Sequence, residues 1–188
     1  MKKLVLFIFL SLLWCNVGYT KDCISIEKIC LGDSAIDFFS KKELKDSEYY
    51  YFDDKNFVTS IINEHPKFKT FETIEIDYNK NDPKYKILYV NGRIFNTRKE
   101  CLVKLDEFNN LISNILNTEG KYSKTKNFSD EQGESFIVAY DFKVNSKVLS
   151  LQCYQWSKRM QSRFTDNFTM SITTKKFQDF QQGITSTF

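Results

Sequence analysis

The sequence predicts an α+β fold. A single domain over residues 21–188 is expected to build an antiparallel sheet of about five to seven strands and to pack one long helix on a face of it. The segment 97–117 has the strongest helical periodicity in the chain. Segments with strand-like patterns lie in groups before and after this helix. They do not alternate regularly with helices, as the strands of a parallel sheet would.

The first twenty residues, 1–20, have the features of a secretory signal peptide. Lys2 and Lys3 form a basic start, and the run 4–14 is almost wholly apolar. As a helix this run rises about 16 Å, roughly half of the ~30 Å hydrocarbon core, so it is too short to span a membrane. A small residue at Thr20 places the expected cleavage after it. We therefore predict a secreted or periplasmic protein with no transmembrane segment in the mature chain.

The mature chain is almost neutral. Of 27 basic residues, 25 remain without Lys2 and Lys3, against 24 acidic residues. Nucleic acid and anionic membranes both select a basic surface, so neither is expected as the main partner. The composition leaves an unknown protein or a small ligand as the partner, and it indicates no cofactor.

Four cysteines remain after removal of the signal peptide: Cys23, Cys30, Cys101 and Cys153. An even number in an oxidising compartment favours disulfides, for which three pairings exist. No Cys-x-x-Cys motif supports a redox or zinc site. The preferred pairing joins Cys101 to Cys153 and Cys23 to Cys30. In the chain-entropy model the first of these bonds is worth roughly 4 kcal/mol.

The domain is predicted to begin with a short extended piece and then a short helical region, in which Ser40 and Glu43 form a capping box. Strands are expected next over residues 49–52, 57–62, 74–78 and 85–90. The run 85–90 is apolar on both of its faces, which predicts that both are covered. We expect the segment 36–39 to cover the face opposite the long helix, or to leave a groove beside it.

A second capping box, Thr97 with Glu100, opens the long helix. Apolar residues then recur every three or four positions and predict one buried stripe: Cys101, Leu105, Phe108, Ile112 and Ile115. The polar segment 121–133 is expected to be a loop. The remaining elements are predicted to be strands over 135–142, 147–154 and 168–173 and a short helix over 176–182.

Two segments resemble a family of small, uncharacterised exported proteins of marine alphaproteobacteria. The first is 26–40, with the pattern Ile-x-x-Ile-x-Leu-Gly-Asp-Ser-Ala-Ile-Asp-Phe-Phe-Ser, and the second is 153–158, Cys-Tyr-Gln-Trp-Ser-Lys. The similarity also includes the helix that begins at Cys101, and so covers nearly the whole mature chain. The resemblance implies export but no activity.

Three patterns suggest catalysis or metal binding, and each has a plainer interpretation. His65 is the only histidine and lies in an expected surface turn. The segment 77–81 starts like a calcium loop, but the glycine and the glutamate that such a loop needs are missing. Ser123 and Lys126 have the spacing of a Ser-Lys nucleophile, but they lie in the predicted loop. The sequence therefore predicts no catalytic residue and no metal site.

Tyr154, Trp156 and Lys158 combine aromatic and cationic side chains at the end of a predicted strand. Such a group suits a surface that binds a carbohydrate or an anion, although its rings would also serve to pack against the helix. The first hypothesis is an exported, non-enzymatic envelope protein that binds a protein or a small ligand here. The alternative is a small exported hydrolase with carboxylate or Ser/Lys chemistry. Converging carboxyl groups of shifted pKa would favour the hydrolase.

Overall fold

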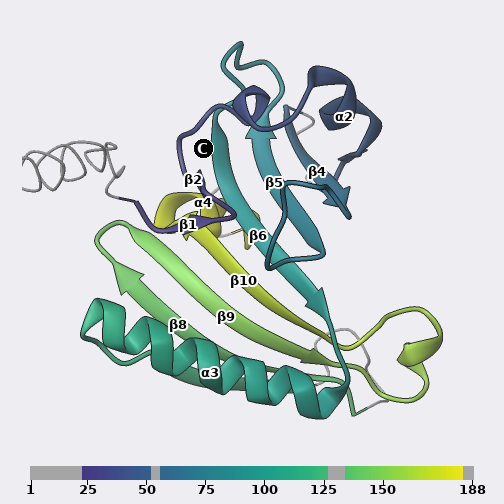
Figure 1. Ribbon diagram of the computed structural model, residues 1–188, viewed down its shortest axis with the longest axis vertical. Coiled ribbons are helices and arrows are strands. Elements are labelled where there is room, and N and C mark those ends of the chain that lie inside the picture. The colour runs from purple at the N-terminus through teal and green to yellow at the C-terminus, as the bar shows by residue number, and fades with distance from the viewer. Residues whose placement is uncertain (1–22, 52–55, 127–133, 184–188) are drawn as a thin grey trace, which may run out of the picture.

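A computed structural model describes residues 23–51, 56–126 and 134–183, and the predicted signal peptide lies outside them. Its main feature is an eight-stranded antiparallel sheet in the order β3-β4-β5-β6-β10-β9-β8-β7 (Figure 1). These strands are β3 (Glu48–Tyr49), β4 (Phe57–Asn63), β5 (Thr73–Asn79), β6 (Ile87–Phe95), β7 (Lys121–Lys126), β8 (Phe136–Val144), β9 (Lys147–Gln155) and β10 (Asn167–Thr174). The other elements are the hairpin of β1 (Ser25–Ile26) and β2 (Ile29–Cys30), the helices α2 (Lys41–Asp46), α3 (Arg98–Leu116) and α4 (Lys175–Gln181), and the 3₁₀ turns η1 (Ala35–Asp37) and η2 (Met160–Ser162).

The α+β class and the antiparallel sheet are confirmed, but the sheet has more strands than the five to seven expected. The additional strand is β7, which lies in the segment predicted to be a loop. All six residues of β7 are exposed. A strand without a buried face has no alternation of apolar and polar residues, so its sequence carries no strand signal.

Two antiparallel meanders form the sheet. β3 to β6 make the first, β7 to β10 make the second, and α3 connects them along the chain. The meanders join where β10 pairs with β6, with Thr169 opposite Arg93 and Ser171 opposite Asn91. Segments that are distant in the sequence therefore meet at the centre of the sheet.

One face of the sheet carries both α3 and the N-terminal segment. α3 packs on β9 and β10, while α2 lies beside β4, where the Ser60 hydroxyl donates to the Leu44 carbonyl at 3.0 Å. Ser60 is in register with Ile76, and Ile76 with Val90. Residues in register point to the same side of a sheet. The expectation that segment 36–39 covers the opposite face is therefore wrong: the buried Phe39 joins the same core as α3, because one helix is too narrow to cover eight strands.

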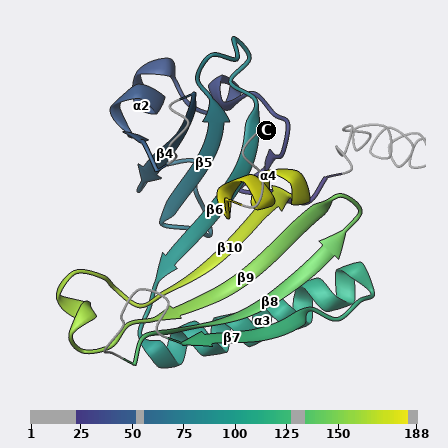
Figure 2. The ribbon, with the colours of Figure 1, turned by 180° about the vertical axis from the view of Figure 1, so that it is seen from behind.

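The opposite face, called here the polar face, presents the other set of alternating side chains. Thr59, Asp77, Tyr89 and Thr173 lie in register across it. Figure 2 shows α4 in front of this face, with α3 behind the sheet. The buried Phe177 of α4 packs on Phe57, with 5.8 Å between ring centroids. α4 therefore covers one end of the polar face.

The long helix follows its sequence signals closely. Both predicted capping boxes are present, at Thr97 and Ser40. α3 ends at Asn117, which adopts the left-handed conformation with φ 48°. Of the predicted stripe, Cys101, Leu105 and Ile112 are buried and Phe108 is partly buried, but Ile115 is 67% exposed. No helix in the described part of the chain is long and apolar enough to cross a membrane.

The structure pairs the cysteines as preferred from the sequence. Cys101 at the start of α3 bonds to Cys153 in β9, across 52 positions of sequence. Cys23 bonds to Cys30 across seven positions. The first bond therefore links the helical layer to the sheet, while the second closes the β1–β2 hairpin.

Candidate functional site

A cleft of about 470 Å³ opens on the polar face. β5, β6, β9 and β10 supply its floor, with one or more side chains each: Glu75, Tyr89, Asn91, Arg93, Gln152, Tyr154, Asn167 and Thr169. The segment between β9 and β10 adds Trp156, Arg163, Phe164 and Thr165 at one end. Strand alternation explains the polar floor, since every second residue of each strand points away from the core.

Three aromatic rings form a column in this cleft, called here the aromatic stack. The centroids of Tyr154 and Trp156 are 6.4 Å apart and their planes differ by 22°. Trp156 and Phe164 lie closer, at 4.4 Å and 18°. Trp156 is thus the middle ring, and Phe164 is 44% exposed. The backbone N–H of Trp156 donates to the Asp166 carboxylate at 2.7 Å, which fixes the segment that carries the stack.

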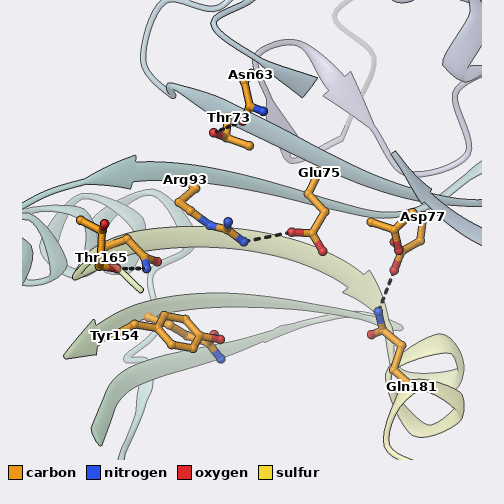
Figure 3. Close-up of polar contacts among 11 residues, drawn as sticks. Asn63, Thr73, Glu75, Asp77, Arg93, Tyr154, Thr165 and Gln181 are labelled. Carbon is orange, nitrogen blue, oxygen red and sulfur yellow. Dashed lines mark hydrogen bonds and ion pairs between the residues drawn. The ribbon is translucent and has the colours of Figure 1, made fainter. Parts of the chain in front are cut away.

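The charged groups of the cleft are two arginines and one glutamate. The Arg93 guanidinium lies 3.1 Å from the Glu75 carboxylate (Figure 3). Burial raises the pKa of Glu75, and the charge of Arg93 opposes that increase. Arg163 is exposed, and no carboxylate of the described residues forms an ion pair with it. With Glu75 ionised, the cleft therefore carries a net positive charge.

Asp77 lies two residues beyond Glu75 but does not line the cleft. It is 2% exposed and accepts hydrogen bonds from the Thr59 hydroxyl at 2.6 Å and from the Gln181 amide of α4 at 2.9 Å (Figure 3). Burial raises the pKa of Asp77 to about 8, although the bond from Thr59 lowers it. α4 therefore seals this carboxyl group at the covered end of the polar face.

Several amide and hydroxyl groups complete the floor. The Tyr154 hydroxyl donates to the Gln152 carbonyl oxygen at 2.8 Å, and the Asn167 amide donates to the Thr165 carbonyl at 2.9 Å. The Asn91 side-chain oxygen is buried and has no hydrogen-bond partner among the described residues. The floor thus offers the amide N–H groups of Gln152 and the side-chain oxygen of Asn167 for further hydrogen bonds.

The three binding residues that the sequence suggested lie in two neighbouring hollows that share Trp156. Tyr154 and Trp156 line the cleft. Trp156 and Lys158 line the second hollow, together with Arg159. The sequence did not suggest Arg93 and Glu75 as binding residues, because charged residues are common at solvent-facing positions of any strand. Their proximity to the aromatic stack follows from the register between strands, which the sequence pattern does not contain.

The residues that suggested catalysis are either packed in the fold or point away from each other. The His65 side chain is only 12% exposed, lies 3.4 Å from Glu43, and packs on Phe39 with 5.5 Å between centroids. The expected surface turn is therefore a partly buried contact. Ser123 and Lys126 are three residues apart on β7, so they point to opposite sides of the strand.

The calcium-like segment forms a local turn. The Asn79 side-chain oxygen accepts from the backbone N–H of Asn81 at 2.8 Å, so it is engaged within the turn itself. Among the described residues there is no group of three or more His, Cys, Asp or Glu side chains suited to hold a metal ion. Comparisons with known proteins found no matching family model, curated protein or solved structure.

Proposed function

We propose that this protein is exported and binds a small, polar, ring-bearing ligand in the cleft without converting it. The observation that carries this proposal is the aromatic stack beside the polar floor of the cleft. Ligand sites typically enclose about 300–1,000 Å³ and combine aromatic surface with a few placed polar groups. The cleft, at about 470 Å³, has that size, and it places the aromatic stack beside a mainly polar floor.

Each part of the cleft has a role in such binding. The partly exposed ring of Phe164 is backed by Trp156 and offers a flat surface. A stacked ring pair contributes about 0.5–1.5 kcal/mol beyond the area that it buries. Gln152 and Thr169, which face each other in register on β9 and β10, offer hydrogen bonds to the edge of the ligand. A ligand with one flat face and polar edges fits both.

The hydrolase is the second candidate, because Glu75 and Asp77 both have a raised pKa. General acid–base catalysis requires each group to reach the substrate. Glu75 is held by Arg93, and Asp77 lies beneath Gln181 of α4. This arrangement supports binding over hydrolysis. Turnover of a glycoside or an ester by the mature protein, abolished in Glu75→Gln, would reverse that preference.

Export is supported by two features. Two disulfides suit an oxidising compartment such as the periplasm or the extracellular space. The basic and apolar start of the chain suits a signal peptide. Both agree with the resemblance to small exported proteins of marine alphaproteobacteria, and we include membership of that family in the proposal.

The test is a ligand panel measured on the mature protein by native mass spectrometry and by thermal shift. The panel contains monosaccharides, sugar acids, disaccharides, amino acids and nucleosides. We expect at least one compound to bind, and Phe164→Ala to weaken its affinity about tenfold, as loss of a stacking surface does. The melting temperature should change by only a few degrees, since the Phe164 ring is 44% exposed.

The matched control is Tyr122→Ala. Tyr122 is also a partly exposed aromatic residue, at 55%, but it lies on β7 outside the cleft. It should leave the affinity unchanged. Equal losses in both variants, or no ligand from the whole panel, would count against a binding cleft.

A further inference from the structure

We infer that the ligand of the cleft is an acidic sugar, a hexuronic acid or a short chain of them, and that Arg163 binds its carboxylate. This inference rests on the proposed function, because it specifies the ligand of the same cleft. Three features of the cleft carry it: the charge balance, the available N–H donors of Gln152 and Arg93, and the polar surroundings of the aromatic stack.

The charge balance favours an anion. Arg93 and Glu75 form an ion pair at 3.1 Å and largely neutralise each other. Arg163 lies at the end of the cleft that carries Phe164, without a carboxylate partner among residues 23–51, 56–126 and 134–183. A guanidinium group presents N–H donors in a planar fork that matches both oxygens of a carboxylate. A carboxylate ligand would therefore supply the charge that this end of the cleft lacks.

Two side chains of the floor keep N–H donors for a ligand. The Gln152 carbonyl oxygen is already used by the Tyr154 hydroxyl, which leaves the Gln152 amide N–H groups for a ligand. One nitrogen of Arg93 contacts Glu75, which leaves several N–H groups of that guanidinium for other acceptors. A ligand rich in oxygen atoms satisfies these donors.

The body of the ligand must be a ring with hydroxyl groups rather than a plain hydrocarbon ring. The partly exposed Phe164 ring requires a flat apolar face. Asn167 and Thr169 offer hydrogen bonds to polar edges around that face. An aromatic acid would leave these groups without hydrogen bonds to the ligand. A pyranose ring with a carboxylate meets both requirements.

The experiment compares matched sugars by isothermal titration calorimetry on the mature protein. D-Glucuronate and D-galacturonate, as monomers and trimers, are paired with neutral D-glucose, D-galactose and their oligomers, and benzoate supplies a ring with a carboxylate but no hydroxyl groups. We expect at least one uronate to bind ten or more times more tightly than its neutral counterpart and than benzoate. Because the contact is ionic, the affinity of the protein for the uronate should fall as the salt concentration is raised.

Arg163→Gln should reduce the affinity for the uronate about tenfold, to the level of the neutral sugar, and should leave the affinity for the neutral sugar unchanged. Arg159→Gln is the matched control. It removes the same charge four residues earlier, but Arg159 lines the neighbouring hollow rather than the cleft. It should leave uronate affinity within about twofold.

The outcomes separate this inference from the proposed function. Equal affinity for neutral and acidic sugars, or equal effects of the two arginine variants, overturns the inference and leaves a sugar-binding cleft. Benzoate binding as tightly as the uronates overturns the sugar assignment. Absence of binding by every uronate also overturns the inference, while a hit of another class in the ligand panel would still support a binding cleft.

Discussion

Asp77 shows how a single residue can make the stability of this protein depend on pH. The unfolded chain loses the Asp77 proton near pH 4, whereas the folded chain retains it until about pH 8. Between these values the folded state binds more protons than the unfolded state. The free energy of unfolding therefore falls as the pH rises from about 4 to about 8.

Asp77→Asn should remove this dependence. The Asn oxygen can accept from the Thr59 hydroxyl, and its amide can donate to the Gln181 side-chain oxygen after rotation of that amide. We expect the variant to be more stable than the natural chain at pH 8 by more than about 1 kcal/mol. The difference should narrow towards pH 4. Urea unfolding at four pH values measures it, and an equal or larger slope in Asp77→Asn would contradict the raised pKa.

Gly92 is a second residue whose role depends on its neighbours. An added Cβ atom would lie 2.5–2.7 Å from atoms of the Phe71 ring. Phe71 is buried and belongs to the core under α3. The glycine therefore makes room for a ring that packs directly against the backbone of β6. Close approach of this kind is one reason for glycine inside a strand.

At the scale of elements, α4 is held on the polar face by one apolar contact and one polar contact. Its buried Phe177 contacts Phe57, and its last residue, Gln181, donates to Asp77. The Thr174 hydroxyl caps the helix start by accepting from the backbone N–H of Phe177. A helix of seven residues is not stable alone, so these contacts hold it in place.

Phe177→Ala should detach α4 from the sheet. The loss of a buried phenylalanine costs about 3–5 kcal/mol. Trypsin should then cut after Lys175 or Lys176 faster than in the natural chain, because both precede Phe177 in the released helix. Phe180→Ala, which removes a less buried ring of the same helix, should have a smaller effect on both urea unfolding and cleavage. Unchanged cleavage in Phe177→Ala would show that Phe177 does not hold α4.

The long helix and the central strands could be predicted from the sequence, and β7 could not. The capping box at Thr97 and the apolar stripe of α3 marked that helix within a residue of its ends. The central strands carry alternating or continuous apolar runs and include them, but β6 begins two residues after the start of the predicted segment 85–90 and continues five residues beyond its end. β7 has no buried side chain and no pattern, so its pairing with β8 is determined by the neighbouring strand rather than by its own sequence.

At the scale of the whole molecule, the cleft depends on how the two meanders join. Arg93 of β6 lies opposite Thr169 of β10, and Thr169 lies opposite Gln152 of β9. This register brings Arg93 into the same cleft as the aromatic stack. Tyr154 and Trp156 could be suggested from the sequence because aromatic residues at a strand end are visible there. Arg93 and Glu75 could not, since a slip of one residue in register would turn them to the other face. Arg163 lies outside the strands, between η2 and β10, where no strand pattern points to it.

The two disulfides should contribute differently to the stability of the whole molecule. The bond between Cys101 and Cys153 spans 52 positions and joins α3 to the sheet, whereas the bond between Cys23 and Cys30 spans seven. In the chain-entropy model the longer loop is worth about 4 kcal/mol and the shorter about 2 kcal/mol. We therefore expect the Cys101→Ala/Cys153→Ala double variant to lose more free energy of unfolding than Cys23→Ala/Cys30→Ala.

Urea unfolding without reductant compares the two double variants with the natural mature chain, and intact mass after alkylation verifies the bonds. The natural chain should show no free thiol, and each double variant should retain one bond.

The comparison also separates entropy from packing, because treating the natural chain with reductant opens both loops and keeps all four sulfur atoms. If the disulfides stabilise through chain entropy, reduction should lower the free energy of unfolding by about the sum of the losses measured in the two double variants. A larger loss in Cys23→Ala/Cys30→Ala would instead show that the β1–β2 hairpin, packed against the core through Ile26 and Ile29, stabilises the molecule more than the link between α3 and β9 does.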